Sequence, residues 1–182
     1  MIAQAGDVVF SGKRAFNFYS RIVMHVTGSR WSHCFPVVGD ALGELSALES
    51  DLDVTLVSFH QQYEVKNADY YEVWRPVKAS ADDVALTGKY VYDNFAEEPY
   101  GFFKPIWFLL RAVLARVGIH LSRNWFHGGI VCSGLLYWYI SALNKEYAEA
   151  LYGLSADTAS PQDLYAIVKA RPDLFQYVGA RT

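Results

Sequence analysis

Cysteine is scarce in this 182-residue chain, which contains only Cys34 and Cys132. Two cysteines cannot build a disulfide scaffold or a zinc site made of cysteine alone, so the chain must fold on its hydrophobic core. A chain of 20.5 kDa is long enough to do so, because proteins of this size bury roughly 68–70% of their unfolded surface. We therefore expect a single domain over residues 1–182.

Long uncharged hydrophobic stretches are also missing. The most apolar segment, residues 102–121, is interrupted by Lys104, Arg111 and Arg116, so it lacks the run of about 18 apolar residues that predicts a membrane-spanning helix. The N-terminus shows no basic region followed by an apolar one, and we expect no signal peptide. The sequence leaves the localisation open between the cytoplasm and delivery by a larger machine such as a virion.

Acidic residues are absent between Pro99 and Lys145, although the whole chain has a net charge of −3. The negative total argues against a general nucleic-acid binder. The basic and aromatic stretch after Pro99 has two interpretations. It is either a core helix whose few charges are solvated, or a helix that contacts an anionic surface through Lys104, Arg111 and Arg116.

The apolar pattern predicts an α+β fold, in which a small antiparallel sheet packs against several helices. Strands are expected over residues 7–10, 33–38, 45–49, 54–57, 70–74 and 175–178. Helices are expected over residues 16–26, 81–95, 103–117 and 133–143, with one more beginning after Ser160. Ser80 and Ser160 are typical N-cap residues for two of these helices.

Cys132 follows a glycine-containing loop, Gly128-Gly129-Ile130-Val131, and stands at the expected start of a helix. Unpaired backbone N–H groups and the helix dipole favour a thiolate at that position, and they can also stabilise an oxyanion. The alternative is a buried structural cysteine, which is a common fate of this residue.

A cysteine nucleophile needs a base, usually a histidine, and the base needs an orienting acceptor. The chain has five histidines, and all precede Cys132: His25, His33, His60, His120 and His127. His33 begins an expected strand, which gives it a rigid position. Glu49 ends the next strand, where antiparallel pairing would place it beside His33, although it could equally be a solvated strand end. Cys34 should point to the opposite face from His33, so we expect no Cys34–Cys132 disulfide.

Four motifs together resemble a known family. Cys132-Ser133-Gly134-Leu135-Leu136 resembles the signature of NlpC-type papain-like cell-wall peptidases, and Pro99-Tyr100-Gly101 resembles the Pro-Tyr motif that precedes it. No histidine follows Cys132, so the order fits only the circularly permuted branch of YiiX-like and lecithin retinol acyltransferase-like proteins. Gly6-Asp7 and Ser32-His33 are similar to the opening motifs of that branch.

The resemblance implies a permuted papain-like fold with a probable helical insertion at about residues 102–123. It implies a catalytic triad of Cys132, His33 and Glu49, with Tyr100 as a further hydroxyl donor, and it implies no metal and no organic cofactor. The chain departs from the pattern at Gly101 and Gly134, where YiiX-like proteins often carry acidic residues.

Three functions are compatible with these observations. The first is a cysteine hydrolase, an amidase or endopeptidase that acts on the stem peptides of peptidoglycan. The second is a lipid-directed acyltransferase or thioesterase at a membrane surface, which the basic stretch would favour. The third is a structural module without activity in a larger assembly such as a virion.

Overall fold

A computed structural model describes residues 3–12, 21, 24–25, 28–39, 44–50, 53–65, 70–96, 98–99, 101, 110, 114, 118–119 and 129–181. Six antiparallel strands form one sheet in the order β4-β3-β2-β1-β5-β6. The strands are β1 (Val8–Gly12), β2 (His33–Gly39), β3 (Leu45–Ser50), β4 (Val54–Ser58), β5 (Tyr70–Pro76) and β6 (Phe175–Arg181). The α+β architecture expected from the sequence is confirmed.

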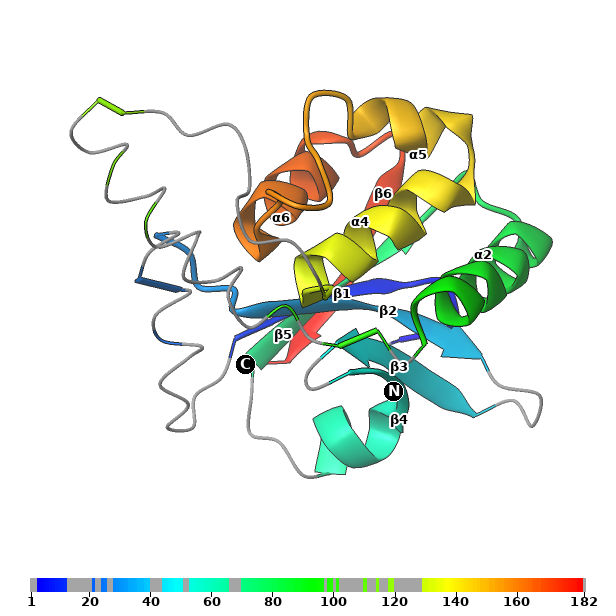
Figure 1. Cartoon of the computed structure of the whole chain (residues 1–182). Coiled ribbons are helices and arrows are strands. Elements are labelled where there is room, and N and C mark those ends of the chain that lie inside the picture. The colour runs from blue at the N-terminus through cyan, green and yellow to red at the C-terminus, as the bar shows by residue number, and fades with distance from the viewer. Residues whose placement is uncertain are drawn as a thin grey trace.

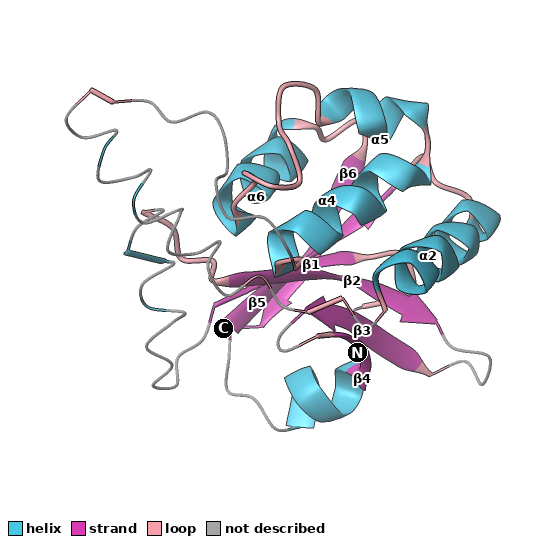
Figure 2. Ribbon diagram, viewed as in Figure 1, coloured by secondary structure: helices cyan, strands magenta, loops and turns pink. Residues whose placement is uncertain are grey.

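The helices cover both faces of the sheet unequally (Figure 1). They are η1 (His60–Val65), α2 (Ala81–Phe95), α4 (Cys132–Leu143), α5 (Lys145–Ala150) and α6 (Pro161–Ala170). The four α-helices lie on one face, and the short π-helix η1 lies on the other, as the colouring by secondary structure also shows (Figure 2). None of the helices in the described ranges is both long and apolar enough to cross a membrane.

The sheet separates two hydrophobic cores. The larger core, on the α-helical face, contains Val8, Phe10 and Cys34 together with Cys132. The smaller core, on the η1 face, contains the side chains that alternate with these along the strands, such as Phe35, which follows Cys34. Alternate side chains of a strand point to opposite faces, and because both faces are covered, every residue of β1 is buried.

Two predicted helix starts are confirmed in detail. The hydroxyl of Ser80 accepts a hydrogen bond from the backbone N–H of Asp83, and the Asp83 carboxylate accepts one from the backbone N–H of Ser80. Ser160 and Asp163 form the same reciprocal arrangement at the start of α6, where Pro161 occupies the first turn. Such capping boxes satisfy N–H groups that a helix N-terminus leaves unpaired.

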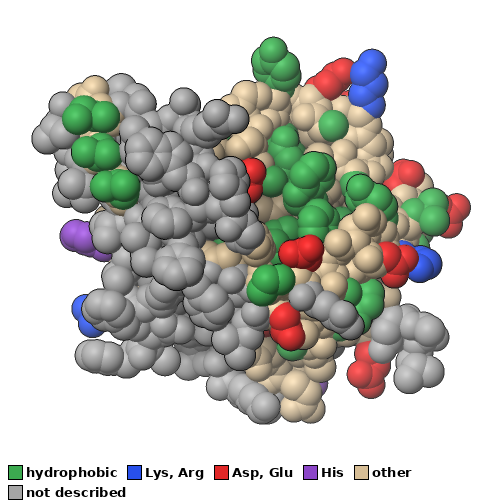
Figure 3. Space-filling view, in the orientation of Figure 1, with side chains coloured by type: hydrophobic (Ala, Val, Ile, Leu, Met, Phe, Trp, Pro, Cys, Tyr) green, Lys and Arg blue, Asp and Glu red, His purple; other side chains and the backbone are tan. Residues whose placement is uncertain are grey.

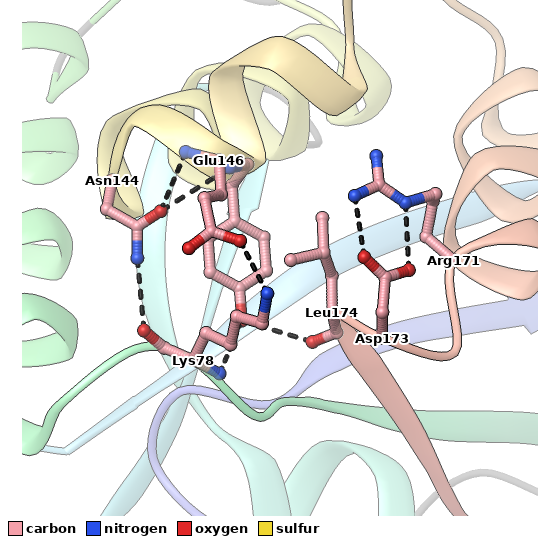
Figure 4. A network of polar contacts seen from close by, with 7 residues as sticks. Lys78, Asn144, Glu146, Arg171, Asp173 and Leu174 are labelled. Carbon is pink, nitrogen blue, oxygen red and sulfur yellow. Dashed lines mark hydrogen bonds and ion pairs between the residues drawn. The ribbon is translucent and has the colours of Figure 1, made fainter.

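A network of polar contacts, part of which Figure 4 shows, joins α5 to the segment after β5 and to the residue before β6. The hydroxyl of Tyr147 accepts from the backbone N–H of Lys78 at 2.9 Å and donates to the carbonyl of Leu174 at 3.1 Å. Around it, ion pairs join Lys78 to Glu146 and Arg171 to Asp173. The sequence pattern predicted neither α5 nor this network.

The helical face also carries apolar side chains in contact with water. Figure 3 shows them among acidic groups in the space-filling view. Trp138 on α4 is 40% exposed and Tyr152, just after α5, is 96% exposed. The predicted helix over residues 103–117 lies mostly outside the described residues, but Leu110 and Leu114 are helical.

Candidate active site

Cys132 is the first residue of α4, and its side chain is almost entirely buried. The N-cap residue, Val131, has extended backbone angles and no side chain that accepts a capping hydrogen bond. The first turn is fixed from outside instead, because the Ser133 hydroxyl donates to the carbonyl of Ala159 at 2.7 Å. The sulfur therefore stands beside backbone N–H groups that no side chain satisfies, which is a favourable place for negative charge.

The loop before Cys132 is held by close backbone contact with the segment around Pro99. Ile130 donates its N–H to the carbonyl of Pro99 at 3.0 Å and accepts from the N–H of Gly101 at 3.1 Å. Gly129 has a φ of 70°, and a Cβ atom there would lie 2.4 Å from the Pro99 oxygen, so only glycine fits. The hydroxyl of Ser50 adds a hydrogen bond to the Ile130 carbonyl at 2.9 Å.

Tyr100 lies between two residues of this contact, Pro99 and Gly101, but is itself outside the described residues. Lys104, Arg111 and Arg116 are also outside them. The predicted hydroxyl donor and the predicted anionic-surface contacts therefore remain predictions.

His33 begins β2, and its imidazole lies between a thiol and a carboxylate. The Cys132 side chain raises the pKa of the imidazole, and the Nε2 atom of the ring is 3.5 Å from Oε1 of Glu49. On the η1 side the ring packs against Phe35, with 5.5 Å between centroids. The three residues predicted as a triad are thus brought together from α4, β2 and β3.

Glu49 has a second partner that sequence reasoning missed. The hydroxyl of Tyr63 in η1 donates a hydrogen bond to Oε1 of Glu49, and both side chains are buried. The Tyr63 ring packs on Phe35 at 4.5 Å between centroids. The spacing of Phe59 and Tyr63, one helical turn apart, was the available signal, but it could not reveal that the hydroxyl donates to a carboxylate of β3.

The electrostatics of the site favour a thiolate and an imidazolium. Burial alone would lower the pKa of His33, but the Cys132 charge and hydrogen bonds to Cys132 and Glu49 raise this pKa to about 10. A hydrogen bond from the Cys34 side chain and the positive charge of His33 hold the pKa of Cys132 well below its ordinary value, against the opposing effect of burial. Such a pair provides a nucleophile and a proton donor at the same time.

Cys34 lies closer to Cys132 than predicted. Alternation along β2 is as expected, since Cys34 belongs to the core under α4 while His33 packs against Phe35 on the other face. The pKa values of both His33 and Cys34 are raised in part by Cys132. Both cysteines are free thiols, and the electrostatic interaction between them was not predicted.

A cavity of about 210 Å³ borders the loop that carries Cys132. Gly129 and Ile130 of that loop line it, as do Phe95 and Trp138, whose ring centroids are 6.0 Å apart. Within the described ranges, histidine, cysteine, aspartate and glutamate side chains form no group of three or more that could hold a metal ion.

No family model matches the sequence, and no curated protein does. Among solved structures, the crystal structure of the metalloprotein YiiX from Escherichia coli O157:H7 is similar, with a TM-score of 0.49 and 17% sequence identity. The similarity covers 68% of this chain and 71% of that chain.

Proposed function

We propose that this protein is a cysteine hydrolase that works through an acyl-enzyme, with Cys132 as nucleophile, His33 as acid and base, and Glu49 as the group that orients His33. The observation that carries the proposal is the position of the His33 imidazole, whose Nε2 atom is 3.5 Å from Oε1 of Glu49 and whose pKa is raised by the Cys132 side chain. This is the relation between nucleophile, base and orienting group that recurs in unrelated hydrolases.

The proposed reaction begins when the Cys132 thiolate attacks a substrate carbonyl. The free N–H groups at the start of α4 stabilise the oxyanion, and Tyr100 is proposed as a further donor. The imidazolium of His33 protonates the leaving group as the thioester forms. Neutral His33 then takes a proton from water, which attacks the thioester and releases the acid. Glu49 holds the imidazole in place through both steps, and Tyr63 holds Glu49.

We propose a peptide amide of a peptidoglycan stem as the substrate, on the resemblance of the motifs around Cys132, His33 and Pro99. The 210 Å³ cavity beside the Cys132 loop, which Phe95 and Trp138 line in part, offers room for part of such a peptide. The lipid-directed alternative uses the same three residues and differs only in the acyl donor. Its support is the basic stretch with Lys104, Arg111 and Arg116.

The test is to incubate the protein with isolated muropeptides and, separately, with phospholipid vesicles, and to identify the products by mass spectrometry. Cleaved stem peptides that are lost with Cys132→Ala would support the peptidase. Released or transferred acyl chains would favour the lipid enzyme. If both substrates are unchanged while iodoacetamide still labels Cys132 rapidly, the proposal of a hydrolase for these substrates is wrong.

A further inference from the structure

A cavity of about 550 Å³ lies between α2 and one end of the sheet. Its walls come from one side of α2, from the segment before β1, and from the ends of β2 and β5 (Figure 1). Pockets that bind small molecules have volumes of roughly 300–1,000 Å³, so this cavity is large enough for a ligand. It is separate from the candidate active site, because it meets β2 at Val38 and Gly39, whereas His33 begins that strand, about 16 Å away at 3.3 Å per residue.

The lining of the cavity is mainly apolar. It includes Val84 and Ala85 from α2, Val38 from β2 and Leu56 from β4. Leu56 is 44% exposed, so it presents an apolar surface to the solvent at this position. Gly88 lets α2 approach the sheet closely, since a Cβ atom there would lie only 3.0 Å from Cγ1 of Val38. The helix is therefore packed directly on the sheet beside the cavity, and the walls are already formed before a ligand binds.

Three charged side chains line the cavity, and their sum is positive. Asp7 is completely buried, and Arg75 donates to its two carboxylate oxygens from Nε at 2.8 Å and from Nη2 at 2.9 Å. The backbone N–H of Gln4 donates to the same carboxylate at 2.8 Å. The charges of this pair cancel, which leaves the ammonium group of Lys89. Its partner Asp93 lies one turn further along α2 in an exposed ion pair, and such pairs are weak, so Lys89 can turn to an anion in the cavity.

We propose that this cavity binds a free medium-chain fatty acid, whose carboxylate lies at Lys89 and whose alkyl chain runs along α2 towards Ala81. The α2 residues of the lining extend from Ala81 to Tyr92, about 16 Å at 1.5 Å per residue, which suits an extended chain. The acidic residues of the first turn, Asp82 and Asp83, disfavour an anionic group at the other end. Apolar walls disfavour a polar chain, because its polar groups would lose their hydrogen bonds to water.

The experiment titrates the full-length protein with decanoate, below the concentration at which micelles form, and measures the heat of binding. We expect saturable binding of one decanoate per chain. Octanoate should bind roughly tenfold more weakly, because two fewer CH₂ groups are buried. Decyltrimethylammonium, which has a chain of the same length and a positive head group, should bind more weakly than decanoate.

Two pairs of variants locate the ligand. Ala85→Phe places a ring in the cavity and should weaken decanoate binding roughly tenfold or more, whereas Leu86→Phe changes the adjacent residue, which is 69% exposed and outside the lining, and should keep the wild-type affinity. Lys89→Gln should weaken binding about two- to fivefold. Lys145→Gln removes the lysine of a similar ion pair on α5 and should have no effect. Circular dichroism establishes that each variant is folded.

Three results would overturn the proposal. They are the absence of saturable decanoate binding, equal losses of affinity in Ala85→Phe and Leu86→Phe, and tighter binding of decyltrimethylammonium than of decanoate. Binding to phosphatidylcholine vesicles without binding of free decanoate would also overturn it, in favour of a membrane. The series of ligands on the wild-type protein decides the question even if Ala85→Phe fails to fold. The proposal does not depend on the proposed hydrolase, because the readout is ligand binding and not the cleavage of muropeptides.

Discussion

The Nε2 atom of His33 lies 3.5 Å from Oε1 of Glu49, and that same oxygen accepts a hydrogen bond from Tyr63. This oxygen of Glu49 therefore connects the start of β2, through His33, with η1, through Tyr63. The position of the imidazole depends on a chain of contacts that begins in η1.

Replacing Glu49 by Gln should impair catalysis more than stability. The amide keeps the shape of the side chain but removes the charge that orients His33, so we expect kcat/KM for muropeptides to fall by about 10²–10⁴-fold. Glu149→Gln is the matched control, because Glu149 pairs with Lys145 on α5 and its side chain is 65% exposed. Equal activity losses in the two variants would contradict the orienting role of Glu49.

Replacing Tyr63 by Phe should have a smaller effect in the same direction. The ring contacts with Phe35 remain, and only the hydroxyl that donates to Glu49 is lost. A hydrogen bond to a charged group contributes about 1.5–3 kcal/mol, so the activity should fall by roughly tenfold or more. Tyr165→Phe removes a similar tyrosine–glutamate bond, to Glu72 at 3.0 Å, and should leave the pH profile of hydrolysis unchanged.

Iodoacetamide should label Cys132 well before Cys34 near neutral pH. The pKa of Cys132 is lowered, so Cys132 is protonated only when the pH falls through this lowered pKa. The pKa of Cys34 is raised, so Cys34 stays a thiol near neutral pH. The pKa of His33 is about 10, so the imidazolium is lost only as the pH rises through that value. The rate of labelling at Cys132 should be nearly constant between these limits.

His33→Gln supplies the control for this labelling experiment. Without the imidazolium the pKa of Cys132 should rise, and labelling at neutral pH should slow. Faster labelling of Cys34 than of Cys132 in the wild-type protein would speak against a thiolate at Cys132.

Replacing Tyr147 by Phe should destabilise the fold without changing the site. The variant leaves the N–H of Lys78 without its acceptor, whereas the carbonyl of Leu174 keeps the hydrogen bond that it accepts from the N–H of Val77 at 2.8 Å. An unsatisfied buried polar group costs about 1–3 kcal/mol, which urea denaturation can measure. Tyr152→Phe, at a 96% exposed position, should change the free energy of unfolding by no more than about 0.5 kcal/mol.

Replacing Lys104 and Arg111 by Glu should weaken binding to anionic surfaces, if that basic stretch contacts them as proposed. The measurement is co-sedimentation with anionic vesicles or teichoic acid at low and high salt, because screening should reduce wild-type binding. The thermal stability should stay nearly the same. An unfolded double variant would show instead that the segment is structural.

Much of the fold was predictable because its signals are local. Strands such as β1 and β5, and the capped starts of α2 and α6, follow from alternation and from Ser80 and Ser160, which act over a few residues. The neighbourhood of Cys132 was predictable only in part. The interaction of Cys34 with Cys132 and the hydrogen bond from Tyr63 to Glu49 both join elements that are distant in the sequence. No spacing of residues along the chain predicts which of these side chains come together.

Backbone hydrogen bonds join Pro99 and Gly101 to Ile130, two residues before Cys132. They bring the two ends of segment 102–128 to one point, directly before the nucleophile. The loop that carries Cys132 is therefore held by the backbone of Pro99 and Gly101, independently of the length and composition of segment 102–128. A chain with a different sequence in that segment can keep the Cys132 sulfur in the same position.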